Sequence, residues 1–444
     1  MNLEAAPHNL ATRHLPIDVR LFISNRQRLS EALSVEPMSL AVVHANDILP
    51  TTADGAMPLY PNSDLFYLTG IEQEETVLLL APQAHEPTLR EVLFVREPNE
   101  RLRTWEGYKH SQADATAISG VQTVKWLADF PSVFHGLMCD ARNVYLNSNE
   151  HKRAAVEVET RDARFIRETQ ARYPLHRYHR LAPIMQQLRV GKSELEVELI
   201  RRAVEITRGG MLRVMTLLRP GLAEYEVEAE LAAEFIRRRG RFAFSPIVAS
   251  GANNCVLHYL ANNQICQAGD LLLVDVGAAY ANYNADLTRT LPVSGRFTPR
   301  QKQVYQGVLR VLRQAVASAT VGKLYRDWQY EAQDLMNEEL LRLKLITPEE
   351  IRDQTREKPA CQKYFMHGLG HSLGLGVHDL GPMHEPFAPG WVLTVEPGIY
   401  IPAEGFGVRL ENDILITSSG PLDLSADVPI EADEIEEIMS GDRS

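Results

Sequence analysis

The sequence predicts two domains, the first of which has an α/β fold. Its 444 residues are too many for one ordinary hydrophobic core. In the first part, short apolar runs alternate with helix-compatible segments. In the second part, charged amphipathic helices precede apolar strands that carry acidic residues. We expect the domains to span residues 1–176 and 177–444, with a linker between Pro174 and Pro183, whose rings limit helix continuity.

The expected elements of the first domain follow one another in the order of an α/β fold. Residues 19–33 are expected to form a helix, and the charged segment 150–173 is compatible with another. The apolar runs with strand character lie at 40–45, 76–81, 91–95 and 144–146. Residues 61–70 give a turn signal that leads into an aromatic strand. Nothing in this domain gathers enough acids, bases or metal ligands for a catalytic centre.

Capping signals mark the helix starts of the second domain. Ser193 with Glu196, and Thr298 with Gln301, have the spacing of a capping box. Apolar residues follow each at helical spacing, so we expect these faces to pack in the core and not to bind a cofactor. The list of helices is completed by 224–240 and by a short surface helix at 431–439.

The composition excludes several classes of function. A net charge of -12 leaves no basic excess to neutralise phosphates, so no nucleic-acid partner is expected. No apolar run approaches the roughly 20 residues that a membrane span needs, and residues 1–20 lack the apolar core of a secretory signal. The four cysteines form no C-x-x-C pair and fit a reducing compartment, so the sequence predicts a cytoplasmic protein.

A glycine- and histidine-rich stretch, 366–379, is the most unusual part of the sequence. His367 and His371 are four residues apart, which on a helix would put both on one face, as in helical zinc sites. However, each glycine in the stretch disfavours a helix by about 1 kcal/mol relative to alanine. We therefore predict loop and strand packed close to a ligand. For any one isolated histidine, a structural use is the alternative.

Acidic residues interrupt the apolar strands of the second domain. Asp275 lies within an apolar run, where an ionised carboxylate is costly unless cations or hydrogen bonds compensate. Asp286 follows 11 residues later, a spacing that suits a hairpin with both acids side by side. Glu396 ends another apolar run, and in 408–414 alternation puts Glu411 on one face with Arg409 and Asp413. For a single acid, a salt bridge is the alternative; four acids beside the histidines favour one shared site.

The charges of these residues suit a pair of divalent ions. Four carboxylates supply four negative charges, a neutral imidazole adds none, and two divalent cations balance them. Oxygen-rich ligation with one histidine and no thiolate favours Mn²⁺, Fe²⁺ or Co²⁺ over a structural zinc. Two such ions, about 3.5–4 Å apart, would generate a hydroxide nucleophile near neutral pH and stabilise a developing oxyanion.

These motifs resemble those of a known family. The chain is similar to the aminopeptidase P / prolidase branch of the pita-bread metallopeptidases, which also include methionine aminopeptidase. The matching motifs lie at 256–259, 274–277, 285–290, 367–371, 376–379, 394–400 and 408–412. The first domain is similar, chiefly through 62–70, to the creatinase-type N-terminal domain of the longer members. The resemblance implies a creatinase-like α/β domain and a pita-bread α+β catalytic domain.

The resemblance implies a role for each residue of the site. The implied ligands of two metal ions, typically Mn²⁺, are Asp275, Asp286, His371, Glu396 and Glu411. Glu396 would also handle the proton of the attacking hydroxide. His258 and His378 would steady the scissile carbonyl, His367 would line the proline side, and Arg409 would orient Glu411 and the substrate.

One further residue is matched by the resemblance. Trp105 corresponds to a tryptophan that some members lend to a neighbour's active site, although a lone tryptophan is more often a core residue. This implies a homo-oligomer, a dimer or a tetramer.

The resemblance implies hydrolysis of the N-terminal X-Pro bond of peptides with proline in second position, the activity of a Xaa-Pro aminopeptidase. Such bonds lack the amide N–H that many peptidases require. A dipeptidase for X-Pro (prolidase) is the first alternative. A metal-free binding protein on the same fold is the second, although all five ligand types are retained. Creatinase-like C–N hydrolysis is the third, and it would not need the metal ligands.

Overall fold

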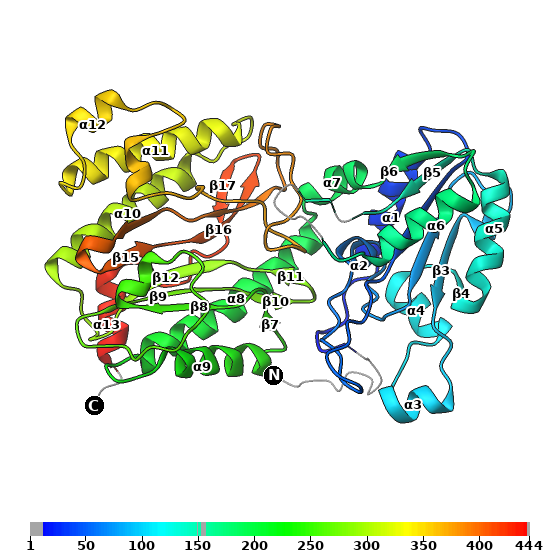
Figure 1. Cartoon of the computed structure of the whole chain (residues 1–444), viewed down its shortest axis with the longest axis horizontal. Helices are drawn as coiled ribbons and strands as arrows, with labels where there is room; N and C mark the ends of the chain where they lie inside the picture. The colour runs from blue at the N-terminus through cyan, green and yellow to red at the C-terminus, as the bar shows by residue number, and fades with distance from the viewer. Residues whose placement is uncertain (1–11, 149, 152–156, 442–444) are drawn as a thin grey trace. The chain divides into compact units, whose positions relative to one another are not determined.

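The computed structural model describes residues 12–148, 150–151 and 157–441, and the chain divides into two compact units (Figure 1). Unit 1 comprises Met1–Arg189 and unit 2 comprises Val190–Ser444. None of the helices in the described part of the chain combines the length and the apolar character that a membrane span requires.

Unit 1 is built on one six-stranded mixed sheet. Its strands are β1 (Ser39–His44), β2 (Val77–Leu80), β3 (Glu91–Val95), β4 (Thr123–Trp126), β5 (Asn143–Leu146) and β6 (Arg177–Arg180). Its helices are α1 (Arg20–Leu33), α2 (Ser63–Thr69), α3 (Glu100–Glu106), α4 (Gln112–Ser119), α5 (Phe130–Asp140), α6 (Arg161–Arg172) and α7 (Ala182–Val190). The expected helix at 19–33 and the expected strands at 40–45, 76–81, 91–95 and 144–146 are confirmed within a few residues.

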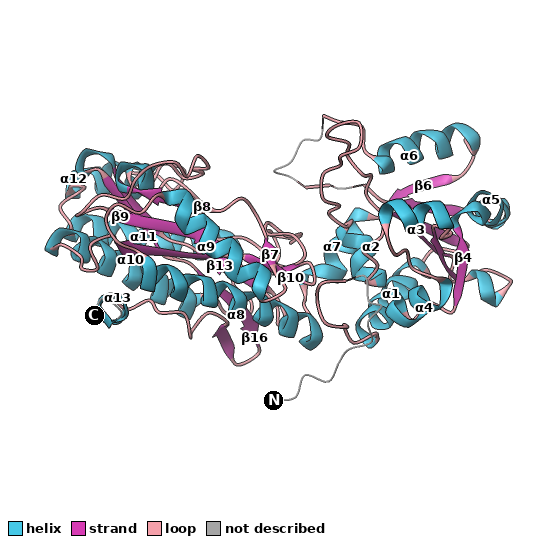
Figure 2. Cartoon of the chain, turned by 90° about the horizontal axis from the view of Figure 1, so that it is seen from below, coloured by secondary structure: helices cyan, strands magenta, loops and turns pink. Residues whose placement is uncertain are grey.

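The inner strands of the unit 1 sheet, β1, β2, β3 and β5, are buried on both faces. The strand order is β4-β3-β2-β1-β5-β6, with antiparallel pairing around β2 and parallel pairing elsewhere. Helices α5 and α6 pack on one face, and α1, α2 and α4 lie on the other (Figure 2). Strands covered by helices on both sides are typical of an α/β domain. The α/β prediction for the first part of the chain is therefore confirmed.

Residues 62–70 form a helix and not the expected aromatic strand. The side-chain oxygen of Asn62 caps α2 by accepting hydrogen bonds from the amides of Asp64 and Leu65. Gly70 ends the helix with a φ of 68°, a left-handed conformation that glycine adopts without strain. Aromatic residues favour strands only where they fit a half-buried surface, and here a strong cap on a fully buried segment outweighs that preference.

The second half of unit 1 also differs from the expected boundaries. Helix α6 covers only the end of the expected 150–173 helix, and residues 152–156 of that segment lie outside the described residues. Strand β6 falls inside the expected linker and pairs with β5, and α7 follows before unit 1 ends at Arg189. The contact boundary therefore lies beyond the expected 176/177 division, because an edge strand rich in arginine lacks the apolar pattern of a strand.

The described residues of unit 2 form four small sheets and six α-helices, four of which pack in two pairs. Its helices are α8 (Glu194–Leu217), α9 (Glu224–Arg237), α10 (Pro299–Ser318), α11 (Tyr325–Arg342), α12 (Pro348–Asp353) and α13 (Ala432–Gly441). Its strands are β7 (Arg241–Phe242), β8 (Ile247–Ser250), β9 (Leu271–Val276), β10 (Ala278–Tyr280), β11 (Tyr283–Asn284), β12 (Leu287–Pro292), β13 (Val392–Val395), β14 (Gly398–Ile401), β15 (Phe406–Arg409), β16 (Asn412–Thr417) and β17 (Gly420–Asp423).

The strands of unit 2 run between the helix pairs. The sheets have the orders β11-β10-β7, β12-β9-β8, β13-β16-β17 and β14-β15. Helices α8 and α9 pack together, with α9 below the strands in Figure 1, and α10 and α11 pack together, with α11 above the strands. Capping boxes at Ser193 and Thr298 begin α8 and α10, as predicted. The mainly antiparallel strands with segregated helices confirm the α+β prediction.

Candidate metal centre

A hairpin brings the first two acids together. Asp275 lies near the end of β9 and pairs across the ladder with Thr288 of β12, while Asp286 immediately precedes β12. Gly277 permits the tight crossing between them, because a Cβ atom there would lie 1.7 Å from the carbonyl oxygen of Ala285. The expected hairpin is confirmed, and it carries one acid on each side.

Glu411 lies at the junction of β15 and β16. Its amide donates to the carbonyl of Thr288 at 3.1 Å, and its carboxylate accepts a hydrogen bond from the Thr288 hydroxyl at 2.7 Å. The fully buried guanidinium of Arg289 donates to the carbonyls of Thr288 and Glu411 at 2.9 and 2.7 Å. Strand β12 therefore fixes both the backbone and the carboxylate of Glu411.

The histidine-rich stretch is a loop that lies against β13. The His371 amide donates to the Thr394 hydroxyl at 3.0 Å, and the Glu396 amide donates to the carbonyl of Leu369 at 2.8 Å. A Cβ atom at Gly370 would lie 2.0 Å from the carbonyl oxygen of Thr394, so the glycine is required for this close approach. The predicted non-helical backbone is confirmed, and it brings His371 beside Glu396.

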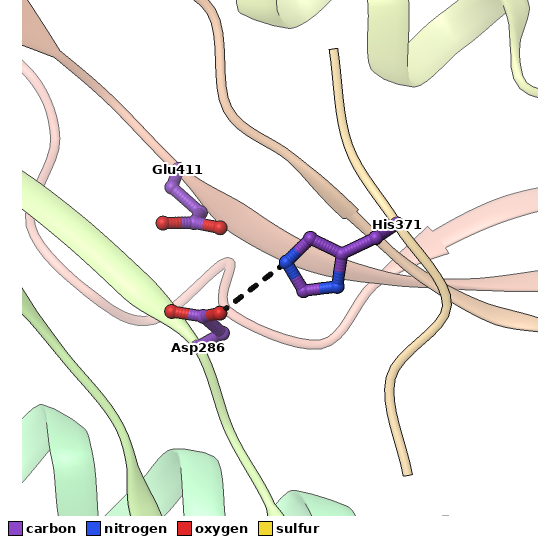
Figure 3. A group of neighbouring side chains, drawn as sticks. All are labelled: Asp286, His371 and Glu411. Atoms are coloured by element: carbon purple, nitrogen blue, oxygen red, sulfur yellow. Dashed lines mark ion pairs between the residues drawn. The ribbon is translucent and has the colours of Figure 1, made fainter. Parts of the chain in front are cut away.

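The five expected ligand residues converge in unit 2. Potential ligand atoms of Asp286, His371 and Glu411 all lie within 4.8 Å of one another (Figure 3). His371 Nε2 lies 3.5 Å from Asp286 Oδ2 and 3.7 Å from Glu396 Oε1. Asp275 is close enough to raise the pKa of Asp286, Glu396 and Glu411 through its charge. The acids therefore share one site and are not scattered salt-bridge partners.

Burial and mutual repulsion perturb these acids strongly. Burial raises the pKa of Asp286 to about 6 and that of Glu396 to about 7. Burial, with the charges of Asp286 and Glu396, holds the pKa of Glu411 well above its usual range. Burial alone would lower the pKa of His371, but Asp286 and Glu396 outweigh it and raise that pKa. The raised pKa values of the acids come first from burial and then from mutual repulsion, and a bound cation would offset both effects.

Arg409 supplies part of the compensation at Asp275. Its Nη2 donates to Asp275 Oδ2 at 2.6 Å, and its Nε donates to the Thr288 hydroxyl at 3.3 Å. Because the same hydroxyl donates to Glu411, Arg409 reaches that acid only through Thr288. Arg409 thus bonds Asp275 directly and is linked to Glu411 through Thr288, and its expected role in orienting Glu411 stays a prediction.

The donor set fits divalent metal ions. In the described part of the chain, Asp275 Oδ1 and Asp286 Oδ1 are buried without a hydrogen-bond partner. His371 Nδ1 lies 3.1 Å from the carbonyl of Ser372, so the assigned tautomer carries its proton there and leaves the Nε2 lone pair toward the acids. Buried carboxylate oxygens without donors and an imidazole in this tautomer are what hard and borderline divalent ions bind.

His367 is held neutral by burial and lies at the end of a chain of hydrogen bonds. Arg409 Nη1 donates to the Tyr400 hydroxyl oxygen at 2.8 Å, and that hydroxyl lies 2.8 Å from His367 Nε2. The hydroxyl proton therefore points to Nε2, and His367 Nδ1 donates to the carbonyl of Gly368 at 2.8 Å. Burial and the charge of Arg409 lower the pKa of His367 to about 4. The ring thus offers an uncharged surface beside the acids.

The other two histidines lie at the rim of the site. The ring of His378 stacks on that of His371, with centroids 3.8 Å apart and planes at 23°. His258 lies close enough to His367 for its charge to lower the pKa of that residue. Both His258 and His378 are exposed. They can therefore meet a substrate, whereas His371 lies deeper, among the acids.

Trp105 belongs to unit 1 and is no core residue. It lies on α3, and 81% of its surface is exposed. Ion pairs of Arg96 and Lys109 with Glu106 hold the end of this helix. Its expected role in a neighbouring active site stays a prediction.

Sequence reasoning missed the residues that connect the ligands. Thr288, Thr394 and Tyr400 each bond two or more groups of the site, yet no role was predicted for them. Their hydroxyls lie on strands that directly follow or precede an expected ligand, and that position is the signal that could have identified them.

The fold and the donor set define a two-domain protein with a carboxylate-rich divalent-metal centre. Residues 198–418 match the model of the family described as "Metallopeptidase family M24". Residues 22–145 match the model described as "Aminopeptidase P, N-terminal domain". The chain therefore belongs to metallopeptidase family M24, whose members hold divalent metal ions.

Individual relatives match along nearly the whole chain. The Xaa-Pro aminopeptidase of Escherichia coli is 33% identical over 94% of this chain and 97% of its own length. Human Xaa-Pro aminopeptidase 3 is 30% identical over 90% of this chain and 80% of its own length.

Two solved structures extend the match to the fold. A putative aminopeptidase P from Bacillus anthracis has a TM-score of 0.88 and 31% identity, covering 95% of this chain and 98% of its own. Zn-substituted E. coli aminopeptidase P in complex with product has a TM-score of 0.85 and 33% identity, covering 97% and 100%. The predicted pita-bread fold with its N-terminal domain is confirmed.

Proposed function

We propose that the protein is a Xaa-Pro aminopeptidase that hydrolyses the first peptide bond of peptides with proline in second position. The convergence of Asp275, Asp286, His371, Glu396 and Glu411 at one buried site carries this proposal. The same convergence argues against a metal-free binding protein on this fold and against a C–N hydrolase that needs no metal ligands.

These five residues would hold two divalent metal ions, with Mn²⁺ proposed and Co²⁺ or Fe²⁺ as alternatives because oxygen donors dominate the set. When bound, the ions would make water nucleophilic near neutral pH and polarise the scissile carbonyl. Asp275 enters the set with one carboxylate oxygen already bonded to Arg409, so its other oxygen is the one available to an ion.

Glu396 is the acid best placed to carry a proton. Its side chain is 21% exposed, compared with 13% for Asp275 and 7% for Asp286. One of its oxygens faces His371, and the other lies 3.9 Å from His367 on the rim side. It can therefore accept a proton from the attacking water and return it to the leaving proline nitrogen.

Two exposed imidazoles can stabilise the charge that develops on the carbonyl oxygen. His378 is positioned by its stacking on His371, and His258 stands across the rim near His367. An N–H donor from either ring that strengthens as the oxygen becomes negative lowers the barrier without tightening substrate binding.

Specificity for proline follows from the uncharged surface at His367. The ring is neutral and packs edge-on against Phe365 and Tyr400, with centroids 4.9 and 5.5 Å away. A pyrrolidine ring can pack there, and the bond to proline offers no N–H that the site would have to satisfy.

A peptide panel tests this function. Purified protein loaded with Mn²⁺ should hydrolyse X-Pro-Y peptides and leave X-Ala-Y peptides largely intact. Turnover of X-Pro dipeptides in preference to X-Pro-Y would establish the prolidase alternative. No divalent metal after reconstitution and no hydrolysis of any X-Pro peptide would refute both.

Three further expectations belong to the same proposal. The four cysteines, all in the described part of the chain, carry free thiols, which supports a reducing, cytoplasmic location. The high exposure of Trp105 supports a role between copies of the chain, in a dimer or tetramer. The net charge of -12 supports a function without nucleic acid.

A further inference from the structure

A carboxylate outside the metal centre is buried and fully bonded. Glu224, the first residue of α9, is 0% exposed. Its Oε1 accepts hydrogen bonds from the amide and the hydroxyl of Ser250, both at 2.7 Å. Its Oε2 accepts from the Tyr259 hydroxyl at 2.8 Å and from the Gln264 amide at 2.9 Å. Four donors, together with the N-terminus of α9, compensate the buried negative charge.

The bonds of Glu224 cross to the segment that carries His258. Tyr259 is the next residue, and exposure alternates along this segment: Val256 and Leu260 are 52% and 59% exposed, and His258 is exposed as well. Leu257 and Tyr259 instead pack on the apolar cluster that includes Tyr400. The Tyr259 hydroxyl that donates to Glu224 is therefore on the side of the segment that faces the protein interior. The imidazole of His258 is on the side that faces solvent.

A second acid on α9 holds the far end of the same segment. Glu228, one helical turn after Glu224, accepts a hydrogen bond from Asn262 Nδ2 at 2.8 Å. Asn262 Oδ1 in turn accepts from the amide of Val248 at 3.1 Å. Residues 259–264 are thus fixed to one face of α9, and the turn that presents His258 has its downstream end anchored.

We propose that Glu224 and Tyr259 form a positioning pair that sets the height of the 256–264 segment and so places the His258 imidazole against the substrate. This inference rests on the proposed peptidase function. The hydrogen bonds of the two residues reach none of the proposed metal ligands, so the pair would act on the developing carbonyl charge through His258 and would leave metal binding unchanged. A small movement of a residue that stabilises the transition state lowers kcat more than it raises KM.

A double-mutant cycle tests the proposal on the full chain loaded with Mn²⁺, with an X-Pro-Y peptide. Tyr259→Phe removes the hydroxyl and keeps the ring. We expect it to lower kcat about five- to tenfold with KM changed less than about twofold, as for directly coupled neighbours. In the His258→Ala background, the same change should lower kcat less than about twofold. An equal loss in both backgrounds, or no loss in either, would overturn the proposal.

Two variants serve as matched controls. Ser250→Ala removes a donor from the same carboxylate without releasing Tyr259, and Tyr225→Phe removes the hydroxyl of an exposed neighbour on α9. Both should keep kcat within about twofold of the wild type. If Ser250→Ala lowered kcat as much as Tyr259→Phe does, the effect would come from the Glu224 environment in general. That result would overturn the proposal that the Glu224–Tyr259 hydrogen bond positions His258.

Hydrogen exchange provides a readout that does not need activity. In Tyr259→Phe, the amides of 256–264 should exchange faster while those of β9 stay unchanged. Unchanged exchange in the segment would overturn the proposal. If the wild type hydrolysed no X-Pro peptide, the proposed function would fail, and exchange would still decide whether the pair holds the segment.

Discussion

In unit 1, the buried carboxylate of Asp64 meets the guanidinium of Arg189 at 2.7 Å and the amide of Asn147 at 3.1 Å. In unit 2, Asp275, a partly buried acid of the candidate metal centre, pairs with Arg409, while Asp286 and Glu411 face each other and an imidazole. Asp64 therefore has its charge balanced inside the protein. Asp286, Glu396 and Glu411 do not, and their pKa values rise.

This difference separates a structural carboxylate from a ligand. A buried acid with its own arginine and hydrogen bonds has no need of an ion, so removing its partner costs stability. A group of acids that exceeds its cations is destabilising until an ion binds, so removing one member costs metal affinity instead. The balance of charge at the site is the property that distinguishes the two cases.

The largest effect is expected for Asp286→Asn. It removes a proposed metal ligand and should lower kcat/KM by on the order of 10³ or more, with less metal bound per chain by elemental analysis. Because it also removes a repulsive charge, the metal-free variant should melt at a higher temperature than the metal-free wild type. A metal-free variant that melts lower would contradict our view that the acids repel one another.

His378→Ala should have the next largest effect. This residue stacks on His371 but contributes no carboxylate to the candidate metal centre. We expect kcat to fall by about 10²–10³, as for the loss of one oxyanion-stabilising donor, with the metal content unchanged. Steady-state kinetics together with elemental analysis would check this. Loss of metal in the variant would instead make His378 part of the metal centre.

Arg189→Met tests the structural side of the comparison. It leaves the Asp64 carboxylate buried without its guanidinium, which should destabilise unit 1 by about 3–5 kcal/mol. Urea unfolding followed by hydrogen exchange of the β1 amides would measure the change. Metal content should be that of the wild type, and a variant as stable as the wild type would show that Asp64 does not depend on this pair.

The smallest effect concerns Asp162, an acid of unit 1 whose negative charge is not compensated as that of Asp64 is. Burial and the charge of Asp64 raise its pKa from 3.8 to about 7. The folded protein therefore keeps a proton that the unfolded chain releases, so this group makes folding less favourable as the pH rises from about 4 to 7. Asp162→Asn should thus gain stability relative to the wild type over that interval, measured by urea unfolding. A stability difference independent of pH would contradict the assignment.

Local signals allowed much of the fold to be predicted from the sequence. The capping boxes at Ser193 and Thr298 begin helices as predicted, because a cap acts within three or four residues. The helix at 62–70 was predicted wrongly as a strand, and the strand at 177–180 was missed, because the structure of both segments depends on distant parts of the chain. Whether an aromatic run becomes helix, or an arginine-rich run becomes an edge strand, depends on the surfaces against which it packs.

The candidate site shows the same limit. The identity of its acids and histidines was visible as residues that are costly in apolar strands and loops. The partner of Arg409 could not be predicted. Asp275 lies 134 positions away in sequence, and the two residues meet only after β9 and β15 pack. Glu224 was equally hidden: in the sequence it is one more acid on a charged helix, and only the fold buries it completely.

The spread of the ligands along the chain also bears on how the protein matures. Asp275, Asp286, His371, Glu396 and Glu411 come from separate strands and a loop, joined by segments that include all of α10 and α11. No short peptide contains the full set, so the ions cannot nucleate this domain as zinc nucleates a small finger. Incorporation of the ions should be among the last steps of biogenesis. The metal-free chain should be folded but inactive until metal ions are supplied.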